Sequence, residues 1–379
     1  MTTNQIENLT GTVLAVQANF YRVSLDRVNL YALAAIHGIE DSSIATKELL
    51  CTRRARLKKI GQQICVGDRV VIQEPDWQGN RGAIAEVAPR HNLLDRPPIA
   101  NVDRVLLVFA LADPEIELLQ LSRFLVNIEA SDLDIVLCLN KCDLVTEAER
   151  QTWCDRMQNW GYAPIAISTY TGEGIAQLKQ HLSTGVTVAA GPSGVGKSSL
   201  INFLIPELKL RVGEVSQRLG HGRHTTRHVE LFPLDDRATG YLADTPGFLQ
   251  PALPKTPMEL AYCFPEARQR LASGTCQFND CLHRDEPNCV VQGDWERYAH
   301  YSLFLDDVEA YYSKARDTTK TESTLKTKSG TGGQVQHEPR LVTKKHRRTS
   351  RRTDLQKLDF DIENDNLNDD FGSDLGDRE

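Results

Sequence analysis

The stretch Gly191-Pro-Ser-Gly-Val-Gly-Lys-Ser-Ser199 is the part of the sequence around which the rest can be organised. It fits the pattern G-x-x-x-x-G-K-[ST]. The glycines let backbone N–H groups curve around an anion, the lysine brings a charge to the outer phosphates, and the following serine suits Mg²⁺. The pattern therefore predicts a phosphate-binding loop made of Gly191, Pro192, Ser193, Gly194, Val195, Gly196, Lys197, Ser198 and Ser199.

The flanks of this loop have the expected character. Residues 186–190 are mostly apolar and predict a short buried strand, and residues 199–204 predict the start of a helix. In that arrangement the helix N-terminus faces the phosphates, where its free N–H groups favour negative charge. We therefore expect a strand, a phosphate loop and a helix in an α/β domain, with Lys197 and Ser198 acting in catalysis.

A second motif, Asn140-Lys141-Cys142-Asp143, follows the mainly apolar segment 134–139, which predicts a buried strand. It fits N-K-x-D, which reads guanine: a carboxylate at Asp143 can accept two hydrogen bonds from the N1–H and exocyclic amino group of the base. Asn140 can tie the motif to the phosphate loop, and the stem of Lys141 can lie over the base. Together with the phosphate loop, the four residues predict a guanine-nucleotide site.

The segment Ser168-Thr-Tyr-Thr-Gly-Glu-Gly174 lies between a predicted strand at 163–167 and a predicted helix at 175–182. It resembles the second guanine-contacting loop of GTPases, in which a serine and a following backbone N–H meet the base. Taken alone it also fits an ordinary strand–turn–helix connection. Ser168 is the candidate contact.

Two further segments fit the γ-phosphate and magnesium machinery. Gly222-Arg-His-Thr-Thr226 offers a switch threonine, for which Thr226 is preferred over Thr225. Asp244-Thr-Pro-Gly247 fits D-x-x-G after a strand, where Asp244 can hold Mg²⁺ through water and the Gly247 N–H can reach the γ-phosphate. The predicted magnesium set is Ser198, Thr226 and Asp244.

The order of the motifs is unusual. GTPases generally run from phosphate loop to switch threonine, D-x-x-G, N-K-x-D and serine loop, whereas here the last two come first. Since a site depends on geometry and not on chain order, the sequence predicts a circularly permuted P-loop domain.

Downstream, Cys276, Cys281, His283 and Cys289 have the spacing C-x4-C-x-H-x5-C. Three thiolates and one imidazole make a closed tetrahedral Zn²⁺ site, which is typical of a structural centre. The other six cysteines lack such spacing and are expected in the core or in loops. Residues 295–314 predict one or two helices that complete a small zinc-binding α domain.

Residues 8–95 contain short strand-like runs separated by turn signals, with a basic stretch at 53–59. About five short strands in so short a segment suit an OB-type β-barrel, a fold that often binds RNA. A generic β domain with a solvated basic loop remains the alternative. Arg96-Pro97-Pro98 is predicted to be a linker.

Charge is distributed unevenly over the 379 residues. The net charge is −7, but residues 353–379 hold ten acids and two bases, whereas residues 316–352 hold eleven Lys/Arg and three acids. We expect residues 316–379 to be a mostly disordered tail. No apolar run approaches the ~18 residues of a membrane span and no signal pattern is visible, so a cytoplasmic protein without membrane contact is expected.

Over residues 8–315 the motifs together resemble one family, the circularly permuted GTPases that assist late maturation of the small ribosomal subunit (the RsgA/YjeQ/YloQ family). Phe264-Pro-Glu266 also belongs to the resemblance. It implies hydrolysis of GTP to GDP stimulated by the small ribosomal subunit, and rRNA contacts from the barrel and zinc domains. The expected domains are 8–95, 99–250 and 251–315, followed by the tail, in a monomer.

Small GTPases place a glutamine just after D-x-x-G to orient the attacking water, but here that residue is Phe248. Intrinsic hydrolysis is therefore expected to be slow, with the missing group supplied by a partner or by His224 or His221. Both histidines could instead contact rRNA or solvent. An RNA-binding scaffold with a structural nucleotide is the alternative function, and an ATP-dependent enzyme conflicts with Asp143.

Overall fold

The computed structural model describes residues 9–26, 48–95, 98–208, 229–235, 239–244, 253–254, 256–321, 325–329 and 335–339. The chain divides into two compact units, Met1–Tyr312 and Ser313–Glu379, and each is described by itself. In the described parts, no helix combines the length and apolar character needed to cross a bilayer.

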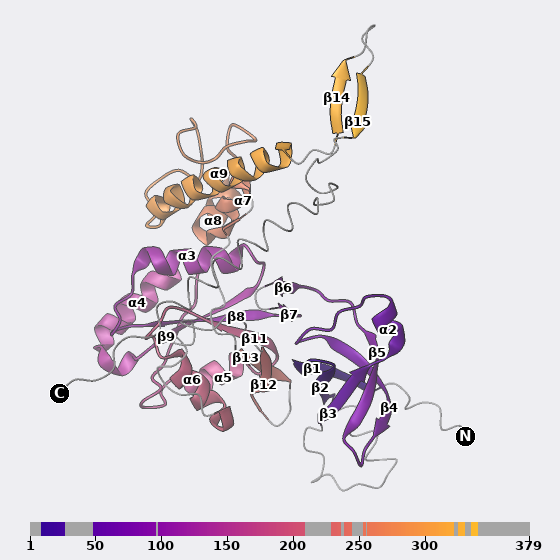
Figure 1. The fold of residues 1–379 in the computed structure, drawn as a ribbon. Helices are drawn as coiled ribbons and strands as arrows, with labels where there is room; N and C mark the ends of the chain where they lie inside the picture. The colour runs from indigo at the N-terminus through magenta and orange to yellow at the C-terminus, as the bar shows by residue number, and fades with distance from the viewer. Residues whose placement is uncertain are drawn as a thin grey trace, which may run out of the picture. The chain divides into compact units, whose positions relative to one another are not determined.

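The N-terminal part is a closed five-stranded barrel, as predicted (Figure 1). Its strands follow the order β1-β2-β3-β5-β4, and β4 pairs back onto β1. Strands β3 and β5 run parallel, whereas the other neighbours are antiparallel. Alternate side chains, among them Val13, Val23 and Ile84, fill the interior. The strands are β1 (Leu9–Gln17), β2 (Phe20–Leu25), β3 (Glu48–Arg53), β4 (Arg69–Asp76) and β5 (Arg81–Val87).

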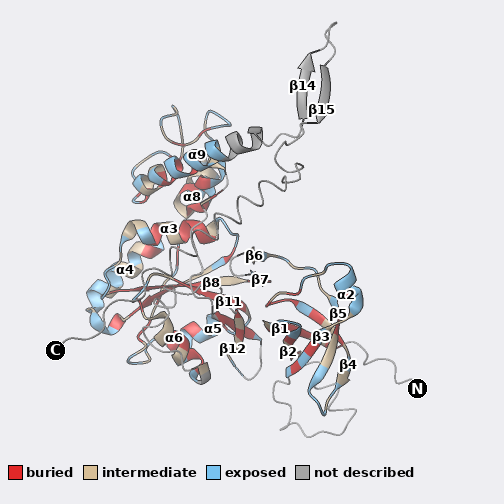
Figure 2. Ribbon diagram, viewed as in Figure 1, coloured by how far each residue is buried: buried red, intermediate tan, exposed pale blue. Residues whose placement is uncertain are grey.

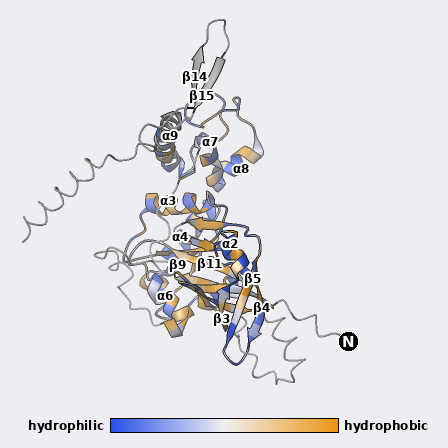
Figure 3. Cartoon of the chain, turned by 45° about the vertical axis from the view of Figure 1, so that its right-hand side comes forward, coloured by the Kyte–Doolittle hydropathy of each residue, from blue (hydrophilic) through white to orange (hydrophobic). Residues whose placement is uncertain are grey.

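The basic stretch and the linker both have more structure than expected. Arg56, Lys58 and Lys59 lie on helix α2 (Ala55–Lys59), which is largely hydrophilic (Figure 3). Leu57 is the buried residue of this helix. Around the predicted linker, β6 (Leu93–Asp95) and β7 (Pro98–Ala100) pair antiparallel. Proline is tolerated there because Pro98 is the first residue of its strand and no ladder bond needs its missing N–H.

The central part is an α/β sheet in the order β10-β9-β8-β11-β13-β12. The first five strands are parallel, and β12 is antiparallel to β13. At its free edge β12 meets barrel strand β1, with Ala15 opposite Glu230. The strands are β8 (Arg104–Ala110), β9 (Asp134–Asn140), β10 (Ile165–Ala166), β11 (Gly185–Ala190), β12 (Glu230–Pro233) and β13 (Gly240–Asp244).

Helices cover both faces of this sheet, and each face has its own apolar core (Figure 2). Leu121, Leu125 and Met157 from α3 and α4 pack on one face, whereas Leu178 and Leu200 from α5 and α6 pack on the other. Parallel strands covered in this way are apolar throughout, which explains why the sequence predicted them well. The helices are α3 (Leu118–Glu129), α4 (Glu147–Asn159), α5 (Ile175–His181) and α6 (Lys197–Leu204).

The C-terminal part of the first unit is helical. Phe264, Trp295, Tyr301 and Phe304 form its aromatic core, to which Val126 of α3 also belongs. Residues 298–321 form one helix, so the single-helix alternative is the correct one for this segment. The helices are α7 (Pro257–Leu260), α8 (Pro265–Ser273) and α9 (Tyr298–Thr321).

The tail departs from the expectation in two places. Helix α9 continues past residue 315 to Thr321, because no proline or glycine interrupts residues 313–321. Strands β14 (Leu325–Ser329) and β15 (Val335–Pro339) pair as a hairpin around a glycine-rich turn sequence. The rest of the predicted tail lies outside the described residues.

Candidate nucleotide site and metal centre

The predicted nucleotide motifs lie at one edge of the sheet. Asn140 is the last residue of β9, and Gly191 directly follows β11. Ser168 follows β10 after one residue, and Asp244 is the last residue of β13. Because these four strands are parallel, their carboxyl ends meet at the same edge, where open α/β sheets bind ligands.

The phosphate loop has backbone positions that only glycine suits. Gly194 and Gly196 have φ of +83° and +92°. At Gly191 an added Cβ would lie 2.0 Å from the carbonyl O of Val108. Gly196 is the N-cap of α6, and no side-chain cap occupies the first amides of the helix, which suits an anion. Ser198 and Ser199 follow in the first turn of α6, and both are half-buried.

Lys197 lies inside this loop. Its Nζ donates to the carbonyl O of Gly191 over 2.8 Å and also to that of Pro192. Burial lowers the pKa of the Lys197 ammonium to about 8. Carbonyl groups compensate only part of the lost hydration, whereas a phosphate would offset the charge directly.

Asn140 joins the predicted guanine motif to the phosphate loop. Its Nδ2 donates to the carbonyl O of Val195 over 2.8 Å. The side chain is fully buried, and its Oδ1 has no hydrogen-bond partner within the described structure. A buried acceptor without a partner is rare and fits a site completed by a ligand.

The rest of the motif ends in an exposed turn. Lys141 adopts a left-handed conformation with φ of +60°, and its ammonium donates to the carbonyl O of Asp113. Cys142 is buried, whereas Asp143 is exposed in the turn Cys142–Leu144. The carboxylate of Asp143 is therefore accessible to a base bound at this edge.

Ser168 is fully buried, and its hydroxyl shapes its own loop. Its Oγ accepts from the N–H groups of Tyr170 over 3.2 Å and Thr171 over 3.0 Å. The amides of Ser168, Gly172 and Glu173 are also hydrogen-bonded within the loop or to its own side chains. The amide of Thr169 is the one in this six-residue stretch without a partner, so it is the donor the loop offers a ligand.

The switch predictions fall elsewhere. Six residues of these predictions lie outside the described residues: Thr226, His224 and Gly247, the alternatives Thr225 and His221, and Phe248. For Asp244 the structure describes the backbone, which pairs with Glu230 at the end of β13, but not the side chain.

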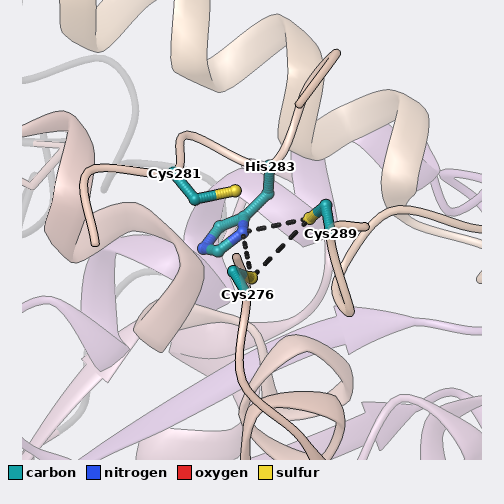
Figure 4. Close-up of side chains that lie close together, drawn as sticks. All are labelled: Cys276, Cys281, His283 and Cys289. Carbon is teal, nitrogen blue, oxygen red and sulfur yellow. Dashed lines mark hydrogen bonds between the residues drawn. The ribbon is translucent and has the colours of Figure 1, made fainter. Parts of the chain in front are cut away.

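The structure brings Cys276, Cys281, His283 and Cys289 together, with all four candidate ligand atoms within 4.8 Å of one another (Figure 4). His283 Nδ1 lies 3.5 Å from the Sγ of Cys276 and 3.3 Å from that of Cys289, and these two sulfurs are 3.9 Å apart. Metal–ligand bonds of about 2.0–2.3 Å in a tetrahedron place neighbouring ligand atoms roughly 3.4–3.8 Å apart. The cluster can therefore hold a metal ion.

Hydrogen bonds fix the loop that carries the imidazole. Tyr298 donates from its hydroxyl to the carbonyl O of His283 over 2.9 Å, and Tyr301 donates to that of Leu282 over 2.7 Å. Glu286 accepts from the N–H groups of Leu282 and Arg284. Such outer contacts orient the ligands of a metal centre.

Sequence reasoning missed Arg297. Its side chain is fully buried, its guanidinium forms a bidentate ion pair with Glu266, and it lies 4.8 Å from the ring centre of Trp160. An arginine just before a helix normally indicates an exposed charge, so its own position gave no signal. The signal that the sequence did offer was the acidic residue of Phe264-Pro-Glu266, which is the partner of this arginine.

Known proteins are similar to this chain over most of its length. The family model "RsgA GTPase" matches residues 87–254. A protein from Trichormus variabilis named "Small ribosomal subunit biogenesis GTPase RsgA" is 58% identical over 356 residues, which cover 92% of this chain and 96% of the relative. The chain belongs to the RsgA GTPase family. An Arabidopsis thaliana relative, "Small ribosomal subunit biogenesis GTPase RsgA 1, mitochondrial", is 43% identical, with 92% of this chain and 85% of the relative covered.

Solved RsgA-type structures agree. YloQ, titled "a circularly permuted GTPase", matches with a TM-score of 0.63 at 30% identity, covering 82% of this chain and 98% of that one. YjeQ from Thermotoga maritima matches with a TM-score of 0.62 at 31% identity, covering 80% and 99%. The predictions of a circularly permuted GTPase fold and of a GTP hydrolase are confirmed, and the family match favours them over the RNA-binding scaffold.

Proposed function

We propose that this GTPase binds the small ribosomal subunit and assists its late maturation, hydrolysing GTP when the subunit stimulates it. The names of its relatives support the ribosomal assignment. The observation that carries the nucleotide part is the hydrogen bond from Asn140 to Val195, because it joins the guanine motif to the phosphate loop at one sheet edge.

In this proposal each motif contributes one interaction. Asp143 reads the guanine edge, the Thr169 amide meets its carbonyl side, and Lys141 lies along the base. The loop amides and Lys197 hold the phosphates. Ser198, Thr226 and Asp244 would hold the Mg²⁺ that accompanies GTP, and the ion would supply positive charge to the phosphates.

The metal of the Cys₃His cluster is proposed to be zinc in a structural role. Thiolate and imidazole donors select zinc over magnesium or calcium, and four protein ligands leave no position for a substrate. The ion would fix the loop 276–289 against α9, and no step of hydrolysis passes through it.

Small GTPases have a water-orienting glutamine at the position of Phe248. In this proposal, binding to the subunit completes the hydrolytic site, and His224 is the candidate group that orients the water. The barrel, with its basic helix α2, and the metal-binding domain are the proposed rRNA contacts. We further propose a cytoplasmic monomer with domain boundaries near residues 95, 250 and 315.

The test is GTP turnover by the purified protein with and without small ribosomal subunits, beside the variant Asp143→Asn. We expect slow intrinsic hydrolysis, a clear increase with subunits, and in the variant a preference for xanthine nucleotides, whose C2 carbonyl suits an amide donor. Turnover that subunits leave unchanged would overturn the ribosomal part. Unchanged GTP affinity in Asp143→Asn would overturn the guanine assignment.

A further inference from the structure

Glu173 contacts three parts of the site edge at once. Its carboxylate accepts a hydrogen bond from the Cys142 thiol over 3.7 Å and pairs with Arg150 of helix α4 over 2.5 Å. Its backbone O accepts from the N–H of Ser168 over 3.1 Å. One residue therefore touches both guanine-reading segments and the helix that follows the first of them.

The two segments are otherwise joined through their backbones. The Cys142 N–H donates to the carbonyl O of Ile167 over 3.1 Å, just beyond the last pair of β9 with β10, Leu139 and Ala166. Beyond this point Asp143 lies in an exposed single turn, and Thr169 lies in a loop bonded mainly to itself. Within the described residues, the side chain of Glu173 thus links the two guanine-reading segments beyond their last backbone hydrogen bond.

The surroundings fix the direction of the Glu173 side chain. Arg150 is held from its other side by Glu147, one turn earlier on α4, over 2.5 Å. Helix α4 is itself fixed at its start by the Thr146–Glu149 capping box. Cys142 is 5% exposed, whereas the Glu173 side chain is about half exposed, so the bond joins a buried donor to an acceptor at the surface.

We propose that Glu173, held by Arg150 and bonded to the Cys142 thiol, is a positioning residue that sets the separation of Asp143 and the Thr169 amide and thereby the selectivity for guanine. This inference rests on the proposed guanine site. A bidentate contact depends on alignment of both partners, so a displacement of Asp143 weakens the contact to the exocyclic amino group.

The experiment compares GDP with IDP, which lacks that amino group, by titration of the full-length protein. Glu173→Ala should lower GDP affinity about fivefold or more while changing IDP affinity less, within the range found for residues of one hydrogen-bond network. Asp155→Ala is the matched control, because it removes a side-chain hydrogen bond from Gln151 on the same helix without touching Arg150 or either guanine segment. Glu173→Gln should restore part of the selectivity, since its amide O can still accept from the thiol.

A second readout separates positioning from general damage. In Glu173→Ala the KM for GTP should rise while subunit-stimulated kcat stays within about twofold, because the phosphate machinery is untouched. Suppose that Asp143→Asn loses GDP affinity but Glu173→Ala keeps the wild-type ratio of GDP to IDP affinity. That result would refute the positioning role alone. If Asp143→Asn also keeps its GDP affinity, the proposed guanine site itself fails.

Discussion

Asn140 and Val195 are 55 residues apart in the chain, yet the side-chain amide of one donates to the backbone O of the other over 2.8 Å. The same Nδ2 lies 2.4 Å from the point where a Cβ on Gly196 would be. The contact thus requires glycine at position 196. It holds the guanine motif and the phosphate loop at a fixed separation, so nucleotide binding should depend on it.

Gly196→Ala should therefore lower GDP affinity by more than about tenfold, because a left-handed alanine costs roughly 1–2 kcal/mol and its Cβ displaces Asn140. Gly61→Ala is the matched control. Gly61 also has positive φ, at +71°, but nothing lies within 4 Å of its added Cβ. Nucleotide titration of both variants checks this, and equal affinities would show that the contact is dispensable.

The pKa of Lys197 predicts a pH dependence of nucleotide binding. In the free protein this pKa is about 8, below the ordinary lysine value of 10.5, because the ammonium is buried. Bound phosphates stabilise the charged form and raise the pKa, so binding above pH 8 must take up a proton. GDP affinity should be flat below about pH 7 and fall as pH rises through 8.

Calorimetry in buffers of different ionisation enthalpy measures that proton uptake directly. Lys197→Arg provides the control, since arginine stays charged over this range. For the free protein the sign of the stability effect is opposite: the cost of burying the charge is present below pH 8 and disappears as pH rises toward 10.5. A pH-independent affinity between 7 and 8.5 would contradict the role of this lysine.

Metal analysis should give about one zinc per chain, bound by the Cys₃His cluster. Cys281→Ser should release the metal and increase amide hydrogen exchange in residues 276–289, with little effect on GDP affinity. Cys263→Ser is the control, because Cys263 is buried in the same core but lies outside the cluster. Full zinc content in Cys281→Ser would contradict the assignment.

The buried pair of Arg297 and Glu266 should matter far more than pairs at the surface. Glu266→Ala leaves the guanidinium buried among Trp160, Tyr162 and Phe264 without a carboxylate, which typically costs about 3–5 kcal/mol. Removing Arg284 breaks exposed contacts and should cost less than about 1 kcal/mol.

Thermal unfolding followed by tryptophan fluorescence measures the difference, since Trp160 contacts the arginine directly. We expect a much lower midpoint for Glu266→Ala than for Arg284→Ala. Similar midpoints for the two variants would mean that the buried pair contributes no more than a surface pair does.

The sequence by itself determined the features that depend on short spacing. Glycines of the phosphate loop, the cysteine–histidine spacing and the apolar strands of the parallel sheet each act within a few residues, so their patterns are visible in one dimension. The permuted motif order could be read in the same way, and it sufficed to predict the fold and the nucleotide class.

Tertiary structure decided what depends on residues far apart in the chain. It buried Arg297 against Trp160, placed β12 beside β1, and brought Glu173 to Cys142. None of these has a local signature. A strand's sequence does not specify which strand it pairs with, and a charged residue before a helix or in a turn normally stays in water. Only the packing of separate elements removes that water, and the free energy of such a contact depends on the partners that packing supplies.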